Sequence, residues 1–526
     1  MRARAASLAV AAIVLLLAMA FMDHRVIAHA AVPAAAATPR AGFTCMQAPV
    51  LSWTLPADAY VAGQDEFNCF AWQEFIGLNW PASATMAGQP DTTAPLSRLG
   101  APSRTGAPAP VVWETYALDT DIFRPLAAPP GPFGGEPARP AVALATSPAA
   151  AALARRPRAR GFAFFVGPHV LHRISKITTR APAVARRTTM RAGPTTSDTS
   201  VFQAFTKSWL TGQNGQVTFY EVRTNKEEFD YIVGARLYDA RTQWAMAQRG
   251  TPIRLPDGYT TGVVGAIEVK AAWLPLTDTT QYTKYITAPA VIVDPATKAA
   301  RQVVVGLTGL HIIHKTRSAQ QFVWATFEHV SNAPDAGSAA TGRYAYYNPA
   351  CAPATDPYKC AVNTQPPTCA GAACNYRAPI QVMRQQPLPD YVVALNDSTQ
   401  AQIRAANPSS VLQYYRLVNT MWPNKSTRDT NTFTPLASGS PKPTAGEGGL
   451  ANAVLETYFQ RTSARSPNPA LSQPGCLACH TMAQISIKAA PTGYSKPTAY
   501  GADYSFLFHL ADTSRTATRS RNTGRP

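Results

Sequence analysis

Acidic residues are scarce in this chain of 526 residues. It holds 30 Asp and Glu residues against 48 Lys and Arg residues, which gives a formal net charge of +18. A basic excess of this size attracts acidic proteins, anionic membrane surfaces and nucleic acids through long-range electrostatics, and it carries no information about the fold. The charge therefore favours an acidic partner protein as one class of binding partner.

Long hydrophobic runs are absent beyond the N-terminus. Residues 1–30 pass from a basic start (Arg2, Arg4) through an apolar stretch to small residues around Ala30, which is typical of a secretory signal peptide cleaved after Ala30. An uncleaved anchor is the alternative, but the apolar stretch is short for a bilayer span of about 20 residues. We therefore expect an exported, periplasmic or extracellular bacterial protein with no membrane span after cleavage, for which nucleic acid is the least expected partner.

Several common catalytic signatures are also missing. The sequence has no Gly-x-Ser-x-Gly elbow, no phosphate-binding glycine loop and no His-Glu-x-x-His zinc helix, so the usual hydrolase and nucleotide-binding classes have no support. No repeat of about 20 to 50 residues is visible, which argues against solenoids and propellers.

The hydrophobic patterns that are present predict an α+β fold. Apolar residues near helical spacing predict a buried helix over residues 66–82, and shorter patterns predict helices over 111–123, 409–423 and 448–462. Runs of β-branched and aromatic residues predict an antiparallel sheet of about four or five strands with flanking helices. The runs cover residues 215–225, 260–276, 282–294, 300–316 and 320–330.

The eight cysteines fall into three groups. Cys45 and Cys69 lie near the N-terminus, and Cys351, Cys360, Cys369 and Cys374 lie in a Pro-rich stretch, residues 344–378, that we expect to be a disulfide-stapled loop. We expect Cys45 to pair with Cys69, and the four clustered cysteines to form two bridges in one of three pairings. A zinc site on those four is the alternative, but they lack Cys-x-x-Cys pairs.

The third group is the motif Cys476-Leu-Ala-Cys479-His480. Two thiols at this spacing can each add to a haem vinyl group, and the next residue is then placed to bind the iron. A shuffled chain of this composition would contain the motif about 0.002 times. A thioredoxin-like redox pair is the alternative, but that pair opens a helix after a strand of an α/β unit, and the flanking sequence is helical and coil.

On this motif the chain resembles c-type cytochromes, over roughly residues 450–510. The resemblance implies one covalent haem c per chain, with Cys476 and Cys479 as thioether anchors and His480 as the proximal iron ligand. Stretches such as "FAWQEFIGLNWP" and "FVWATFEHVSNAP" are also similar to large exported bacterial proteins that join an N-terminal domain to one C-terminal haem. The resulting organisation is a signal peptide (1–30), an α+β domain (31–400) and a helical haem c segment with a basic tail (401–526).

The resemblance assigns no distal iron ligand. Small cytochromes of this type usually supply a methionine some tens of residues after the motif, but here only Met482 follows, and it is too close in sequence to cross the haem. The candidates that remain are His509 from the last predicted helix and residues of the larger domain. The latter are Met383, Met421, His311, His314 and His329.

His311, His314, Glu328 and His329 also suggest a second metal site of two histidines and a carboxylate. Residues three apart in a strand point to opposite faces, so His311 and His314 can share an ion only if that segment is helical or bulged. Otherwise one is a buried, hydrogen-bonded group and the other is solvated.

Three functions are compatible with these patterns. The first is an exported monohaem cytochrome that transfers electrons to or from a redox partner protein. The second is a haem-dependent oxidoreductase, peroxidase-like or oxygenase-like, with a substrate pocket in the large domain. The third is a surface or binding protein with an accessory haem. Oligomeric state, redox partner and substrate are not encoded in any motif that we can identify.

Overall fold

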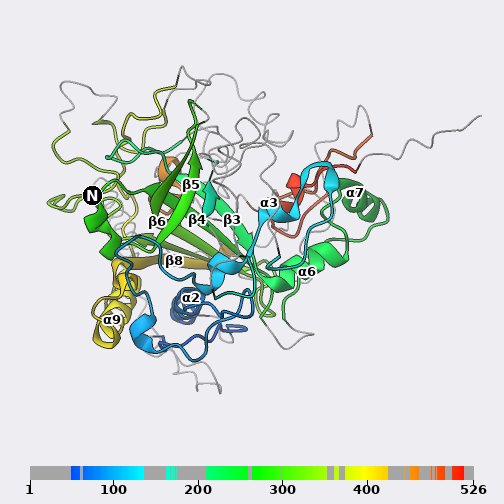
Figure 1. Ribbon diagram of the computed structural model, residues 1–526, viewed down its shortest axis with the longest axis horizontal. Coiled ribbons are helices and arrows are strands. Elements are labelled where there is room, and N and C mark those ends of the chain that lie inside the picture. The colour runs from blue at the N-terminus through cyan, green and yellow to red at the C-terminus, as the bar shows by residue number, and fades with distance from the viewer. Residues whose placement is uncertain are drawn as a thin grey trace, which may run out of the picture. The chain divides into compact units, whose positions relative to one another are not determined.

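The fold is α+β and is built on a mostly antiparallel sheet (Figure 1). The computed structural model describes residues 49–59, 63–135, 161–165, 168–171, 173, 209–258, 264–297, 299–351, 360–366, 374–423, 443–444, 450–460, 476, 480, 483–491 and 500–514. All of these residues belong to one unit, Cys45–Pro526. The expected signal peptide lies outside the described residues.

The described strands form one nine-stranded sheet in the order β1-β3-β4-β6-β7-β8-β9, and β5 pairs with β6 and β2 beside this path. Pairing is antiparallel throughout, except between β2 and β5. The strands are β1 (Ala117–Leu118), β2 (His169–Leu171), β3 (Phe219–Thr224), β4 (Ile267–Pro275), β5 (Thr287–Val293), β6 (Ala300–His314), β7 (Val323–His329), β8 (Tyr415–Pro423) and β9 (Pro443–Thr444). The predicted antiparallel sheet is therefore confirmed, with more strands than expected.

Five α-helices accompany the sheet in the described part of the chain. They are α2 (Gln64–Leu78), α3 (Asp119–Ile122), α6 (Lys226–Gly234), α7 (Ala240–Gln248) and α9 (Asp390–Ala406). Side chains cap two of them: Asn225 accepts from the Glu228 amide at the start of α6, and Asp239 accepts from the Arg241 amide at the start of α7. The helix predicted over 66–82 is confirmed as α2.

One face of the sheet, which we call the helix face, packs against α2 (Figure 1). Phe75 of α2 stacks on Phe327 of β7 with ring centroids 4.3 Å apart, and Trp72 meets the same ring edge-on at 5.0 Å. Helix α9 joins this layer, because Asn396 accepts from the Trp72 indole and donates to the Leu417 carbonyl of β8. Burial of these aromatic side chains supplies much of the core on this side.

The opposite face, which we call the C-terminal face, meets the segments 450–460, 483–485 and 500–511. One row of paired residues crosses it, running Thr224, Glu268, Ile313, Trp324 and Met421 over β3, β4, β6, β7 and β8. The end of the chain also contacts α7, since the Ala240 amide donates to the Asp512 carbonyl and the Gln243 side chain donates to the Phe508 carbonyl. The C-terminal segment therefore lies between this face and α7.

The predictions of a helix over 409–423 and over 448–462 are wrong. Residues 409–423 form a short 3₁₀ turn followed by β8, and the described residues of 448–462 form a single hydrogen-bonded turn and a 3₁₀ helix at Thr457–Phe459. The helix predicted over 111–123 is a 3₁₀ helix, the short strand β1 and the four-residue α3. A helical C-terminal segment is thus not what the described residues show, and β8, beyond the expected boundary at residue 400, belongs to the sheet.

Disulfides staple the expected loop. Cys351 and Cys360 are bonded, with Cα atoms 5.7 Å apart, which selects one of the three possible pairings of the four clustered cysteines. Cys69 and Cys374 each take part in a disulfide as well. Cys45, the partner expected for Cys69, and Cys369 lie outside the described residues.

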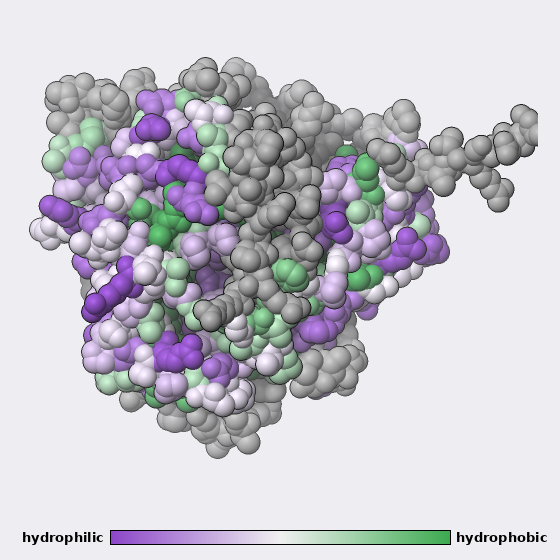
Figure 2. Space-filling view, viewed as in Figure 1, coloured by the Kyte–Doolittle hydropathy of each residue, from purple (hydrophilic) through white to green (hydrophobic). Residues whose placement is uncertain are grey.

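The surface of the described residues mixes polar and apolar groups. On the face shown in Figure 2, hydrophobic residues form small patches among hydrophilic ones. The large hydrophobic residues exposed on the described part of the chain are Val50, Trp53, Met86, Leu96, Leu126, Tyr391, Val393 and Ile487. Among the described helices, none is long and apolar enough to cross a bilayer.

Candidate functional site

His480 packs between two aromatic rings on the C-terminal face. Its ring centroid lies 4.3 Å from that of Trp324 on β7 and 4.7 Å from that of Phe506. Its Nδ1 lies 2.7 Å from the carbonyl oxygen of Tyr504. Because a carbonyl oxygen only accepts hydrogen bonds, Nδ1 must carry the proton, and the ring's lone pair is then on Nε2. This is the tautomer of a histidine that ligates a metal through Nε2 while a backbone carbonyl orients it.

The Tyr504 carbonyl is presented by an unusual turn. Asp503 and Tyr504 both adopt positive φ angles, 50° and 66°, which non-glycine residues rarely do. Buried contacts hold the turn: the Asp503 carboxylate accepts from the Leu255 amide at 2.6 Å and forms an ion pair with Lys315. A backbone conformation that costs about 1 to 3 kcal/mol persists only where such contacts over-determine it, and it often occurs at functional sites.

Cys476 lies against the same hydrophobic cluster. It is half-buried and packs on a group that includes Trp324, Ile485 and Tyr504. The first thiol of the motif and its histidine therefore both lie on the C-terminal face. Cys479 lies outside the described residues.

Two of the predicted distal ligands lie near this cluster. Met421 is buried in it and is the direct cross-strand neighbour of Trp324. His509 lies beyond Phe506, with the two ring centroids 6.4 Å apart, and its Nδ1 is hydrogen-bonded to the Phe506 carbonyl. Burial lowers the pKa of His509 to about 4, so its ring is neutral at pH 7. Met383, by contrast, lies near Asn363, whose side chain accepts from its amide.

The other three predicted ligands use both ring nitrogens in hydrogen bonds with the protein. His311 contacts Thr326 and Glu456, at 2.8 and 2.9 Å. His314 contacts the Glu74 carboxylate at 2.5 Å and accepts from the Gly265 amide at 3.2 Å. To bind iron, either would first have to give up one of these bonds.

His329 is similarly engaged. Its Nε2 donates to the Lys284 carbonyl at 2.9 Å, its Nδ1 accepts from the Ser331 amide at 3.1 Å, and its ring stacks on Tyr285. Burial lowers the pKa of His329 to about 4, which keeps the ring neutral. We therefore assign His329 a structural role in the loop that follows β7.

The second metal site is not formed by the residues that suggested it. His311 meets Glu456 on the C-terminal face, whereas His314 meets Glu74 of α2 on the helix face, as alternation along a strand requires. Within the described part of the chain, no group of three or more His, Cys, Asp or Glu side chains is arranged to hold a metal ion.

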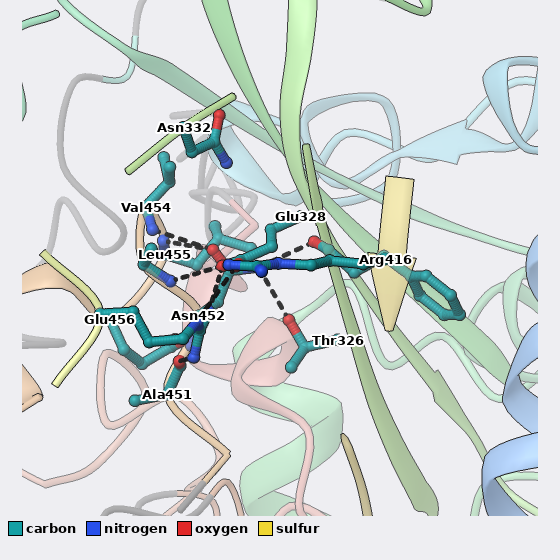
Figure 3. Close-up of polar contacts among 12 residues, drawn as sticks. Thr326, Glu328, Asn332, Arg416, Ala451, Asn452, Val454, Leu455 and Glu456 are labelled. Carbon is teal, nitrogen blue, oxygen red and sulfur yellow. Dashed lines mark hydrogen bonds and ion pairs between the residues drawn. The ribbon is translucent and has the colours of Figure 1, made fainter. Parts of the chain in front are cut away.

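A cluster of polar side chains fixes the segment 451–456 to the sheet (Figure 3). The buried Glu328 carboxylate accepts from Arg384, from Arg416 and from the Ala453 amide, the last at 3.0 Å. Burial alone would raise the pKa of the Glu328 carboxyl, but the two guanidinium groups outweigh it and hold the pKa below its ordinary value. Asn452 adds bonds to Thr326 and to the Phe327 carbonyl. We call Glu328, Arg384, Arg416 and Asn452 the anchor cluster.

Another set of polar side chains lies beside the turn that carries the Tyr504 carbonyl. Glu228 of α6 and Glu268 of β4 are both buried and adjacent, and Ser505 donates to Glu268. Burial raises the pKa of Glu268 to about 7, and burial together with Glu268 raises that of Glu228 well above its ordinary value. Both shifts act in the same direction and favour the protonated form of these carboxyl groups at a higher pH than for exposed acids.

Sequence reasoning did not find Trp324, Tyr504, Glu228 or Glu268. The sequence does indicate on which face of the strand Glu268 lies. It is flanked by Ile267 and Val269 inside a strong β pattern, so its side chain is expected on the face opposite theirs. Trp324 and Tyr504 carry no such indication, since their roles depend on which distant segments pack together.

Comparison with protein-family models, with curated proteins and with solved structures finds no match to this chain. The functional assignment therefore depends on the motif and on the geometry described above.

Proposed function

We propose that this chain is an exported monohaem c-type cytochrome that transfers electrons. The observation that carries the proposal is the state of His480: the residue that directly follows Cys479 in the motif has its Nδ1 proton directed at the Tyr504 carbonyl. That hydrogen bond leaves Nε2 as the basic nitrogen, which is what an iron ligand requires.

In this proposal Cys476 and Cys479 hold the haem through thioether bonds and His480 binds its iron. When bound, haem supplies a one-electron Fe(III)/Fe(II) couple. The protein's own contribution is to orient and shield the ligand. Trp324 and Phe506 both pack against the His480 ring, and the Tyr504 carbonyl fixes its tautomer.

Met421 and His509 are the distal ligands that the arrangement favours. Each is linked to His480 through one intervening aromatic ring, Trp324 for Met421 and Phe506 for His509. His311, His314 and His329 are less suitable, because protein hydrogen bonds already engage both nitrogens of each ring.

Export and an acidic redox partner complete the proposal. The bonded cysteines of the described chain are consistent with an oxidising compartment such as the periplasm. The net charge of +18 favours encounter with an acidic electron donor or acceptor. The expected association rate then falls as salt concentration rises.

The test is an absorption spectrum of the protein purified from a host with c-type haem maturation, recorded oxidised, reduced, and reduced under carbon monoxide. An electron carrier with two axial ligands shows a covalent haem spectrum that carbon monoxide leaves unchanged. Prompt carbon monoxide binding contradicts the electron-carrier assignment and favours the haem-dependent oxidoreductase instead. The variants Met421→Ala and His509→Ala identify the distal ligand, because loss of that ligand alone makes the iron bind carbon monoxide.

A further inference from the structure

The buried acids Glu228 and Glu268 form a pair that lacks the partners expected of ionised carboxylates. Glu228 is fully buried and Glu268 is 7% exposed. Within the described residues, no N–H group donates to either oxygen of Glu228 or to Oε1 of Glu268. Buried carboxylates are normally satisfied by several donors. The pair is satisfied most simply by a proton shared between the two side chains.

The surroundings of the pair favour this shared proton. The Thr224 hydroxyl, on the strand position directly opposite Glu268, is buried and has no hydrogen-bond partner among the described residues. The cations that act on the pair are Lys270 of β4, on Glu268, and Lys315, which follows β6, on Glu228. Lys315 forms an ion pair with Asp503. Asp503 acts on the pair in the opposite sense to Lys315, so this ion pair adds little net charge beside the two acids.

Two uncharged residues also lie beside Glu268. Ser505, from the C-terminal segment, donates to Glu268, and Ile313 of β6 is the neighbour of Glu268 on the other side from Thr224. The charged groups that face the pair from β4, from the end of β6 and from the C-terminal turn are thus Lys270, Lys315 and Asp503.

One peptide unit connects this pair to the proposed iron ligand. The Tyr504 carbonyl accepts the Nδ1 proton of His480, and the next residue, Ser505, contacts Glu268 through its hydroxyl. The same Ser505 oxygen accepts from the Leu507 amide at 3.1 Å, which fixes its position. A change of charge on an iron bound to His480 is therefore expected to act on the pair through this peptide unit, because electrostatic interactions between buried groups are weakly screened.

We propose that Glu228 and Glu268 bind one proton when a haem held by His480 is reduced and release it when that haem is oxidised. The inference rests on the proposed function. An external one-electron reductant supplies the electron, and solvent supplies the proton to the carboxylate of the pair. One negative and one positive charge enter the same buried region together, so its net charge is unchanged.

The test is the midpoint potential of the holoprotein measured as a function of pH, from about pH 5 to about pH 9. For one proton bound per electron, the potential falls by up to about 59 mV for each pH unit, which is a tenfold change in proton concentration. The wild-type protein is expected to show this slope around neutral pH. The variant Glu268→Gln is expected to have a flat profile there, because it removes the carboxyl group that titrates in this range.

Two further variants sharpen the result. Glu228→Gln keeps a hydrogen-bond donor beside Glu268 and removes only the second carboxyl group, so the slope around neutral pH is expected to remain. Asp230→Asn, also on α6 but exposed and paired with Lys226, is the matched control and is expected to retain the wild-type slope. A flat wild-type profile, or an equal slope in wild type and Glu268→Gln, would overturn the inference.

Redox-difference infrared spectroscopy gives an independent readout. Reduction is expected to produce the C=O band of a protonated carboxyl in the wild type and in Asp230→Asn, and no such band in Glu268→Gln. A holoprotein that lacks the band contradicts the coupling alone. A preparation with no covalent haem contradicts the proposed function and the coupling with it, so the two failures are distinguishable.

Discussion

Glu268 illustrates how one residue links the sheet to the C-terminal turn. Its backbone belongs to β4, and its side chain meets Glu228 of α6 and Ser505 near the end of the described chain. Because burial raises its pKa to about 7 from an ordinary value of 4.5, the folded state holds a proton that the unfolded state releases at lower pH. Folding stability should therefore fall as pH rises through this interval.

This linkage predicts the behaviour of Glu268→Gln. The amide cannot ionise, so the variant should avoid the loss of stability that the wild type suffers between about pH 4.5 and about pH 8. The difference in unfolding free energy between variant and wild type should shift in favour of the variant by about 3 kcal/mol across that range. Urea denaturation at several pH values measures it. A difference that does not change with pH would mean that Glu268 is ionised in the folded protein.

At the scale of elements, the anchor cluster determines the conformation of residues 451–456. Arg384 donates to the Ala451 carbonyl and Glu328 accepts from the Ala453 amide, so these backbone groups are engaged by the sheet. The Asn452 side chain accepts from the amides of Val454 and Leu455, at 2.9 and 3.1 Å. Tertiary hydrogen bonds therefore replace the helix that the spacing of apolar residues predicts.

Asn452→Ala tests this role. The substitution removes two accepted and two donated hydrogen bonds in a buried site, and each polar group left unsatisfied costs about 1 to 3 kcal/mol. We expect the unfolding free energy to fall by about 3 kcal/mol, measured by urea denaturation. Asn375→Ala, at an exposed position, serves as the control and should change it by less than about 0.5 kcal/mol. Equal, small effects of the two substitutions would show that the anchor cluster is not what holds this segment.

The strand β8 shows why its helix prediction was wrong. Leu417 and Val418 are consecutive and both buried, because the helices cover one side of the strand and the C-terminal segments cover the other. The pairing with β7 also shifts register between Thr326 and Phe327. A strand that is buried on both sides and interrupted by a bulge loses the alternation by which strands are recognised in sequence.

For the whole molecule, the sequence predicted the local features better than the long-range ones. The α+β class, α2 and the strands between 215 and 330 were predicted from residue patterns, and the bonded state of Cys69, Cys351 and Cys374 was predicted from their clustering and from the expectation of export. The surroundings of His480 do not, because Trp324 lies more than 150 positions away in the chain and meets it only through tertiary packing. Neither the Tyr504 carbonyl nor Glu228 has a local sequence signature, and the alternation around Glu268 indicates its face of the strand but not its burial.

The motif nevertheless identified the segment that carries the candidate site. Its histidine is hydrogen-bonded as an iron ligand would be, and its first cysteine is packed in the same cluster, although the segment around them is not the helical domain that was expected. The proposed covalent attachment of haem depends on three residues, Cys476, Cys479 and His480, and less on the architecture around them.

Peptide mapping by mass spectrometry tests that claim most directly. The protein would be produced in a host with c-type haem maturation, digested, and compared with the double variant Cys476→Ser/Cys479→Ser prepared in the same way. We predict that the wild-type peptide containing residues 476–480 carries one haem through two thioether bonds and that the variant peptide carries none. Unmodified thiols, or a disulfide between Cys476 and Cys479, in wild-type protein would contradict the account.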